Sequence, residues 1–528
     1  MKNSAPLAGR KEWTAFVVLL LPLLLVSMDV SVLFYAVPVI SEDLGVTGTQ
    51  QLWIFDVYAF ALAGLLITMG SLGDRIGRRK LLLAGAAAFG AASVAAAYAR
   101  NAEMLIAARA LLGIGGATLM PSTMALVRNL FRDDKERSKA VGIWSGAMAG
   151  GIALGSVVGG VLLEHFWWGS VFLINVPAMV LLLVLVPVLV PEHKDPQPGA
   201  FDLLGVPLSM GAVLPVVYGL KQIAADGFSP PMAACIAAGL AIGYVFVRRQ
   251  RTHPHPMISR ELFRHRAFGI GIGLNALASA GMMGSAYFTT QYLQSVLGMG
   301  PLESALWGLL PSLAVAAVAP FATTAAHRTH KGYVMAAGFL AGAAGYAVLA
   351  LADTDSLATA LAGAALISAG IVSVMAPASD MALATTPPEK AGTAASLLET
   401  GQEFGTALGM AVFGSIGTAV YRHDLDGSLP ADLPHDVLGA ARETLGGAAG
   451  AAARLPGSTG ESVLAVARDA FTHGMTVASL GGAALLTLAA FAAVTFLRNT
   501  VPGEGPGEAG AAPADAAARD EYARTPSR

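Results

Sequence analysis

The chain contains few charged residues and almost no cysteine. Only 13% of its 528 residues are Asp, Glu, Lys or Arg, whereas 55% are hydrophobic, and the mean hydropathy is +0.62. A soluble domain typically carries about twice that share of charge. The single cysteine, Cys235, excludes an internal disulfide and a thiol pair for metal or redox chemistry. The composition therefore indicates a protein with many membrane spans.

Several motifs of catalysis and energy supply are also missing. The sequence has no glycine-rich phosphate loop followed by a lysine and a serine or threonine, which is the usual ATP-binding motif. ATP hydrolysis is therefore not expected to supply the energy. His253, His255 and His265 lie in a basic loop without the spacing of metal ligands. No combination of nucleophile, base and orienting group is evident. We therefore expect no enzyme activity, no cofactor, no metal and no nucleic-acid partner.

Apolar segments long enough to cross a bilayer recur along the chain. A spanning helix needs about 20 mainly apolar residues. Fourteen segments meet that length: 13–40, 51–72, 81–99, 102–127, 140–163, 169–190, 202–222, 231–248, 268–297, 303–325, 333–352, 357–381, 392–421 and 470–497. The pattern predicts an all-α polytopic membrane protein with fourteen transmembrane helices.

Lysine and arginine accumulate in every second connection. Clusters lie at 75–80, 128–139 and 248–266, whereas the short connections on the opposite side hold only Arg100 and Lys221. By the positive-inside rule the clustered side is cytoplasmic. With an even number of spans, both termini are then cytoplasmic, including segment 1–12. The tail 498–528 is rich in Gly, Pro, Ala and charge, which predicts disorder.

A weak internal repeat divides the spans into two sets. Glycines spaced by four occur at Gly151, Gly155 and Gly159, and again at 401, 405 and 409. Transporters are often built from parallel repeats of six spans. We expect a six-helix half over 13–190, two additional helices over 202–248, and a second half over 268–497. The long outside loop 422–469 either folds as a helical hairpin over the external mouth or is a passive polar linker.

Two charged residues lie deep inside predicted spans. Asp29 follows the middle of the first span, and an acid at that depth costs ~2.5–3.5 kcal/mol on insertion scales. Arg109 lies several residues inside the fourth span and needs a partner for the same reason. Asp29 is the obvious candidate, because both lie in the outer-to-middle zone. The two form either a static structural pair or a pair whose separation couples substrate binding to proton loss.

Further polar and aromatic residues are candidates for a cation site. Trp53 and Asp56 share one face of the second span, with Tyr58 two positions on, and an acid beside an aromatic ring attracts flat lipophilic cations. An interfacial aromatic belt with a solvated acid is the alternative.

The thirteenth and ninth spans add a second set of candidates. Glu399 and Glu403 lie four apart on one helix face, with Phe404 adjacent, and like charges so close disfavour a doubly ionised state. One of them could instead face a cytoplasmic vestibule and be merely solvated. Tyr287 and Gln291 of the ninth span either line the same cavity or join helices by hydrogen bonds.

The most specific local motif is GSLGDRIGRRK, an inside turn between the second and third spans. Its glycines permit tight backbone paths, and its acid and bases can latch neighbouring helices in one state and release them in another. Positive-inside charge alone explains the bases but not the acid or the glycines. The predicted latch residues are Gly70, Gly73, Asp74, Arg75, Gly77, Arg78 and Arg79.

This loop resembles the signature between spans two and three of the major facilitator superfamily. LIAARALLGIGGATLMPS, which contains Arg109, is similar to that family's fourth-span arginine motif. SVFLINVP at 170–177, the first span and the thirteenth span resemble the fourteen-span drug:proton antiporters, in particular pumps for quaternary ammonium compounds. The resemblance covers residues 13–497.

The fifth span resembles the antiporter motif of that subfamily but departs from it at one position. The matching residues are Gly151, Gly155, Ser156, Gly159 and Gly160, and Ser156 stands where the motif has proline. Serine can bend a helix more weakly, by bonding back to the preceding turn. The glycines can serve close helix packing alone or an antiport-specific role.

The resemblance implies a function and roles for these residues. It implies a monomer in the bacterial cell membrane that exports small lipophilic cations in exchange for protons, driven by the proton motive force. Asp29, Arg109, Glu399 and Glu403 would couple protons. Substrate would meet Asp29, Trp53, Asp56, Tyr58, Tyr287, Gln291, Glu403 and Phe404. The alternatives are a dedicated exporter of a self-made antibiotic or metabolite and a non-transporting membrane sensor.

Overall fold

The structure is a computed structural model, and it describes nine stretches of the chain. These are residues 8–131, 133–192, 204–226, 229–252, 262–263, 266–384, 386, 391–429 and 433–497. The described residues form helices and no β-strand, and twelve of these helices are long and apolar enough to cross a membrane. The predicted all-α polytopic fold is therefore confirmed. The segments 1–7 and 498–528, including the tail predicted to be disordered, lie outside the described residues.

The first half of the chain forms one group of packed helices. Its members are α1 (Arg10–Leu44), α2 (Gly48–Ile76), α3 (Arg78–Ala97), α4 (Ala102–Leu130), α5 (Asp134–His165), α6 (Ser170–Leu173) and α7 (Asn175–Leu189). Within this group α1 packs on α5, α2 on α4, and α3 on α4 and α7. The sixth predicted span is divided at Ile174 into α6 and α7.

The second half repeats this arrangement after a two-helix insertion. The insertion is α8 (Gly205–Asp226) and α9 (Pro230–Thr252). The second half comprises α11 (Arg266–Gln291), the π-helix η1 (Tyr292–Val296), α12 (Pro301–Trp307), α13 (Leu309–Arg328), α14 (Lys331–Leu349), α15 (Leu357–Ala384), α16 (Ala391–Ser428) and α19 (Gly457–Leu497). Here α11 packs on α16 and α15, and α14 packs on α15 and α19.

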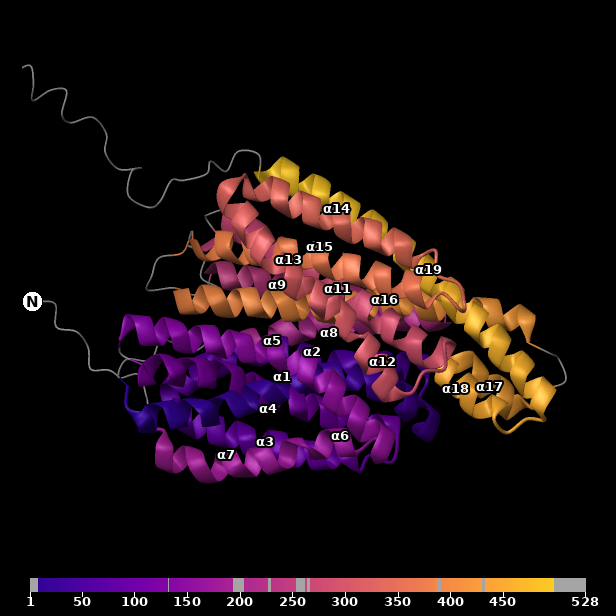
Figure 1. Ribbon diagram of the computed structural model, residues 1–528, viewed down its shortest axis with the longest axis horizontal. Helices are drawn as coiled ribbons and strands as arrows, with labels where there is room; N and C mark the ends of the chain where they lie inside the picture. The colour runs from indigo at the N-terminus through magenta and orange to yellow at the C-terminus, as the bar shows by residue number, and fades with distance from the viewer. Residues whose placement is uncertain are drawn as a thin grey trace, which may run out of the picture.

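The two halves lie side by side along the length of the molecule (Figure 1). They meet where α2 packs along α16 and where α5 packs against α12. The pair α8–α9 packs on itself and covers the α2–α16 seam, since α8 contacts both of those helices. A site at the α2–α16 seam is therefore bounded by α1 and α2 on one side and by α11 and α16 on the other, since α1 also contacts α11.

The predicted outside loop 422–469 contains folded structure. It holds α17 (His435–Glu443) and α18 (Leu445–Ala452), and α19 begins at Gly457, thirteen residues before the predicted span. These helices lie at the end of the molecule opposite the first and last described residues (Figure 1). We call this end the outer end, following the orientation that the charge pattern predicts. The structure thus favours the helical hairpin over the polar linker.

The count of fourteen spans is the part of the fold that stays a prediction. Twelve predicted spans coincide with the twelve candidate helices. The other two fall on α2, which is 29 residues long, and on α8, whose apolar stretch covers Pro207–Gly219. α2 begins sharply because Thr47 caps it: the Thr47 hydroxyl accepts from Gln50 N–H, and the Gln50 side chain accepts from Thr47 N–H.

Candidate functional site

Asp29 and Arg109 form an ion pair in the interior of the first half. Arg109 Nη1 of α4 donates to Asp29 Oδ2 of α1, and both side chains are almost completely buried. Arg109 Nε also donates to the Ile54 carbonyl at 3.1 Å, and the guanidinium lies 4.4 Å from the centre of the Tyr58 ring. The structure therefore brings together the two deepest predicted charges and adds an aromatic face to them. Such stacking contributes up to ~2 kcal/mol when desolvated.

The acids of the thirteenth span approach this group from the second half. Glu403 of α16 lies within electrostatic range of Tyr58 and of Glu399. Both glutamates are only partly exposed in the described molecule. Tyr58 therefore lies near both the Asp29–Arg109 pair and Glu403.

Trp53 and Phe404 lie elsewhere, in the seam covered by α8. The Trp53 ring is 6.2 Å from the ring of Tyr218 in α8. Phe404 packs in the same apolar cluster, beside Phe60 of α2. Trp53 and Asp56 share a helix face in sequence, and Asp56 is buried. In this conformation Trp53 and Phe404 therefore serve helix packing around the candidate site.

Tyr287 and Gln291 face the outer end instead of the Asp29–Arg109 pair. Gln51 Nε2 of α2 donates to Tyr287 Oη of α11 at 3.1 Å, a bond that joins the two halves. Tyr287 and Gln291 both line an outer cavity between the halves. Tyr287 therefore forms an interhelical hydrogen bond, which is one of the two roles expected for it from the sequence.

Glycines spaced by four place α5 against α1. A Cβ on Gly155 would lie 2.2 Å from Ser31 Oγ, and one on Gly151 would lie 2.9 Å from the Leu24 carbonyl oxygen. A side chain at these positions would therefore push the helices apart. Gly159 meets Val32 of α1, whereas Gly160 meets Leu302 of α12 across the halves.

The same ladder places α16 against α11, in nearly the same register. A Cβ on Gly405 would lie 2.0 Å from the Ala276 carbonyl oxygen, and one on Gly409 would lie 2.3 Å from that of Ala280. The weak sequence repeat is therefore a repeat of helix packing. Gly401, Gly405 and Gly409 allow α16 to pack closely on α11. Glu399 and Glu403 lie on this same helix.

Ser156, in the position of the family's proline, bonds back along its own helix. Its hydroxyl donates to the Ile152 carbonyl at 3.2 Å, as the sequence interpretation expected of a serine there. Proline would remove the backbone N–H of this position altogether. The serine keeps the helix continuous through this segment of α5, which runs from Asp134 to His165.

The predicted latch loop is held at the inner end by an acid that the motif does not contain. Glu192, just beyond α7, accepts from the Arg79 backbone N–H at 2.9 Å, at the start of α3. Arg79 Nη1 in turn donates to the carbonyls of Pro187 and Val190. Gly77 has φ +113°, and a Cβ there would lie 2.6 Å from the Glu192 carboxylate.

The other latch residues lie around this contact. A Cβ on Gly73 would lie 2.9 Å from Arg78 Cδ, whereas Gly70 has ordinary space beside Pro121. Arg75 is partly exposed, and the Asp74 side chain lies outside the described residues. Sequence reasoning missed Glu192, because a single acid after a span carries no local signature.

Comparisons with known proteins define the class of this molecule. The family model of the Major Facilitator Superfamily matches residues 19–410, and the chain belongs to that family. It is thus a membrane transporter and not an enzyme.

Among the characterised relatives of the chain are efflux and resistance proteins of this superfamily. The chain is 44% identical to "Multidrug efflux pump LfrA" of Mycolicibacterium smegmatis, over 92% of this chain and 96% of that protein. It is 34% identical to "Methyl viologen resistance protein SmvA" of Salmonella typhimurium, over 90% and 97%. It is 31% identical to "Tetracenomycin C resistance and export protein" of Streptomyces glaucescens, over 97% and 96%.

A solved structure agrees with the fold. The chain matches a bacterial homolog of the human lysosomal transporter Spinster, crystallised in an inward-facing and unoccupied conformation, with a TM-score of 0.65. The match covers 93% of this chain and 99% of that one, at 16% identity. At that identity the likeness concerns the fold alone.

Proposed function

We propose that the protein is a multidrug efflux antiporter of the cell membrane that exports lipophilic cations in exchange for protons. One observation carries this proposal: the Asp29–Arg109 pair is buried against Tyr58, with Glu403 approaching from the other half. A buried carboxylate with an aromatic wall attracts an organic cation. The same carboxylate can be neutralised by a proton, so proton and cation compete for it.

Alternating access turns this competition into transport. The halves rock around the shared site, as in other transporters built from repeats. Protons from outside load Asp29, Glu399 or Glu403, the protein turns inward, and a cation displaces the protons. The loaded form then turns outward and releases the cation. Each proton moving through 100 mV supplies ~2.3 kcal/mol, and no bound cofactor is required.

The remaining predicted residues take supporting roles in this proposal. Tyr58 covers the guanidinium of the pair and Asp56 supplies a further buried acid on α2, while Trp53 and Phe404 pack in the seam under α8. The latch loop with Glu192 ties α3 to the end of α7 on the inner side. Both termini lie on the cytoplasmic side, and one chain suffices for transport, because both halves of the site belong to it.

The names of two relatives support parts of this proposal. LfrA is a multidrug efflux pump, which supports efflux of several compounds, and SmvA is a resistance protein for methyl viologen, a dication, which supports the cation class. The tetracenomycin C exporter favours the second candidate, a dedicated exporter of a self-made antibiotic or metabolite. The multidrug antiporter and the dedicated exporter would use the same transport mechanism and differ only in the exported compound.

Everted membrane vesicles test the proposal. Vesicles are energised in the presence of a pH dye, and ethidium or a quaternary ammonium compound is added. We expect proton movement on addition, and a weaker response in Asp29→Asn and in Glu403→Gln. Asp355→Asn and Glu461→Gln are matched controls at exposed positions and should respond like wild type. A response to an unrelated solute but to no lipophilic cation would refute the cation class, and wild-type behaviour of both site variants would refute the site.

A further inference from the structure

A second cavity lies at the outer end, beneath the cap formed by α17 and α18. Its own lining side chains almost fill it in this conformation, leaving about 30 Å³ of free volume, and it lies between α1 and α2 of one half and α11 and α16 of the other. Ligand sites in proteins measure roughly 300–1,000 Å³, so the cap and Arg422 must move before an organic ligand fits here. The rings of Tyr287, Phe288, Tyr421 and Phe471 line it, together with the Glu443 carboxylate.

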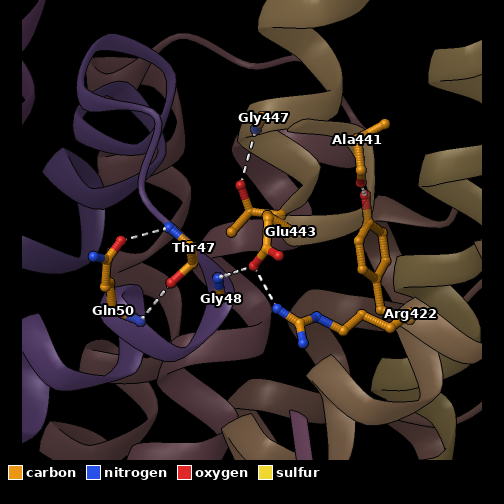
Figure 2. A network of polar contacts seen from close by, with 9 residues as sticks. Thr47, Gly48, Gln50, Arg422, Ala441, Glu443 and Gly447 are labelled. Carbon is orange, nitrogen blue, oxygen red and sulfur yellow. Dashed lines mark hydrogen bonds and ion pairs between the residues drawn. The ribbon is translucent and has the colours of Figure 1, made fainter. Parts of the chain in front are cut away.

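Glu443 ties three parts of the molecule together at the rim of this cavity. As the last residue of α17, it accepts from the Gly48 backbone N–H at 3.2 Å, at the first turn of α2. It also pairs with Arg422 of α16, in the other half (Figure 2). A carboxylate at a helix N-terminus is stabilised by the aligned peptide dipoles. Glu443 therefore connects the cap to both halves.

The rest of the cap is fastened independently of Glu443. Tyr421 Oη of α16 donates to the Ala441 carbonyl at 2.7 Å, and the Thr444 hydroxyl caps α18 by accepting from Gly447 N–H at 2.9 Å (Figure 2). The loss of the Arg422 partner would therefore leave the cap folded. It would remove the charged contact between Glu443 and α16 and leave its contact with α2.

We propose that this outer cavity is a second binding site for the exported organic cation, which replaces Arg422 as the counter-ion of Glu443. Four aromatic rings and one carboxylate are the groups that recognise a lipophilic cation. The side chains of Glu443 and Arg422 are 33% and 18% exposed, so Arg422 can turn toward water when a cation takes its place. The inference rests on the proposed function for the class of ligand.

Occupancy of the outer site also acts on the closure of the outer end. While Arg422 pairs with Glu443, the cap holds α2 and α16 together. A cation bound at Glu443 in place of Arg422 breaks that link. The departing substrate therefore loosens the outer closure that retains it, which gives the site a place on the release path.

Binding stoichiometry in the full-length protein tests this assignment. Purified protein in nanodiscs is equilibrated with radiolabelled tetraphenylphosphonium, and bound cation is counted per chain. We expect two equivalents for wild type, one for Glu443→Gln and one for Asp29→Asn. Asp426→Asn is the control, since the Asp426–Arg442 pair joins the same two helices at 2.5 Å but lies exposed on the surface. This control should bind two equivalents.

The outcomes separate this inference from the proposed function. Undiminished binding by Glu443→Gln, or an equal loss in Asp426→Asn, overturns the outer site. Cation-driven proton movement by a wild type that binds one equivalent overturns the outer site alone. Loss of binding in Glu443→Gln together with full binding in Asp29→Asn supports the outer site and contradicts the proposed inner one. Absence of binding in wild type overturns both.

Discussion

Separating the two charges of the Asp29–Arg109 pair should destabilise the protein strongly. Loss of one partner of a buried ion pair costs about 3–5 kcal/mol, because the other charge stays uncompensated. In Asp29→Asn the Ile54 carbonyl and the Tyr58 ring still contact the guanidinium, so we expect the lower value, about 3 kcal/mol. In Arg109→Gln the carboxylate loses its guanidinium partner, so we expect about 5 kcal/mol at neutral pH.

Replacing both charged residues together should remove most of these two penalties. The double variant buries two neutral amides and should lie within about 2 kcal/mol of wild type, because neutral replacements of a buried pair are often tolerated.

Reversible unfolding in mixed detergent micelles measures the four free energies as a double-mutant cycle. The everted-vesicle assay is run on the same four proteins. We expect the double variant to regain most of the stability and none of the proton movement. Additive penalties would contradict the pairing, and wild-type proton movement by the double variant would show that the pair has no part in coupling.

Two further variants examine the cap and the glycine ladder. A Cβ on Gly446 would lie 3.2 Å from Ser41 Cβ, close to the Cβ–Cβ separation of about 3.8 Å in disulfides. The variant Ser41→Cys/Gly446→Cys, made in a Cys235→Ser background, can therefore form a disulfide between the cap and α1. Ethidium efflux by this variant should stop under oxidation and return under reduction. Efflux that persists after complete cross-linking would show that the cap need not leave α1. Gly405→Ala should lower stability by about 1–3 kcal/mol through overpacking, measured by unfolding in detergent, whereas Gly481→Ala, with open space around it, should be neutral. Equal effects would contradict close packing at Gly405.

The sequence predicts contacts best where lipid makes the alternative costly. Each predicted span falls on one helix or on two consecutive helices, because twenty apolar residues have few other stable states in a bilayer. Asp29 and Arg109 could be paired in advance, since two buried charges at similar depth need each other. The glycine ladders of α5 and α16 also predicted close packing, although their partners α1 and α11 could not be read from spacing alone.

The sequence did not predict contacts at solvent-exposed ends of helices or between segments far apart in the chain. Glu443 contacts Gly48 across 395 residues, and neither carries a local motif. Glu192 is a single acid after a span, so its position at the start of α3 depends on how α7 ends. Trp53 beside Asp56 predicted a cation site, but α8 packs Tyr218 against that ring. Helix periodicity gives the face of a residue and cannot say which other helix covers it.

In the proposed mechanism, the different depths of three ion pairs assign proton coupling to the central one. Arg79–Glu192 at the inner end and Arg422–Glu443 at the outer end have partly exposed side chains, so water can solvate each charge when the pair opens. Such exposed pairs contribute about 0–1 kcal/mol. The Asp29–Arg109 side chains are 2% and 1% exposed, and water cannot compensate either charge.

The central pair can therefore separate at low cost only when another species neutralises the carboxylate. A proton and an organic cation are the two species that can do so, and they exclude each other at one acid. Conformational change that requires the pair to open is then possible with either species bound and costly with neither. That restriction is what a coupled exchanger requires, and it follows from burial of one pair together with exposure of the other two.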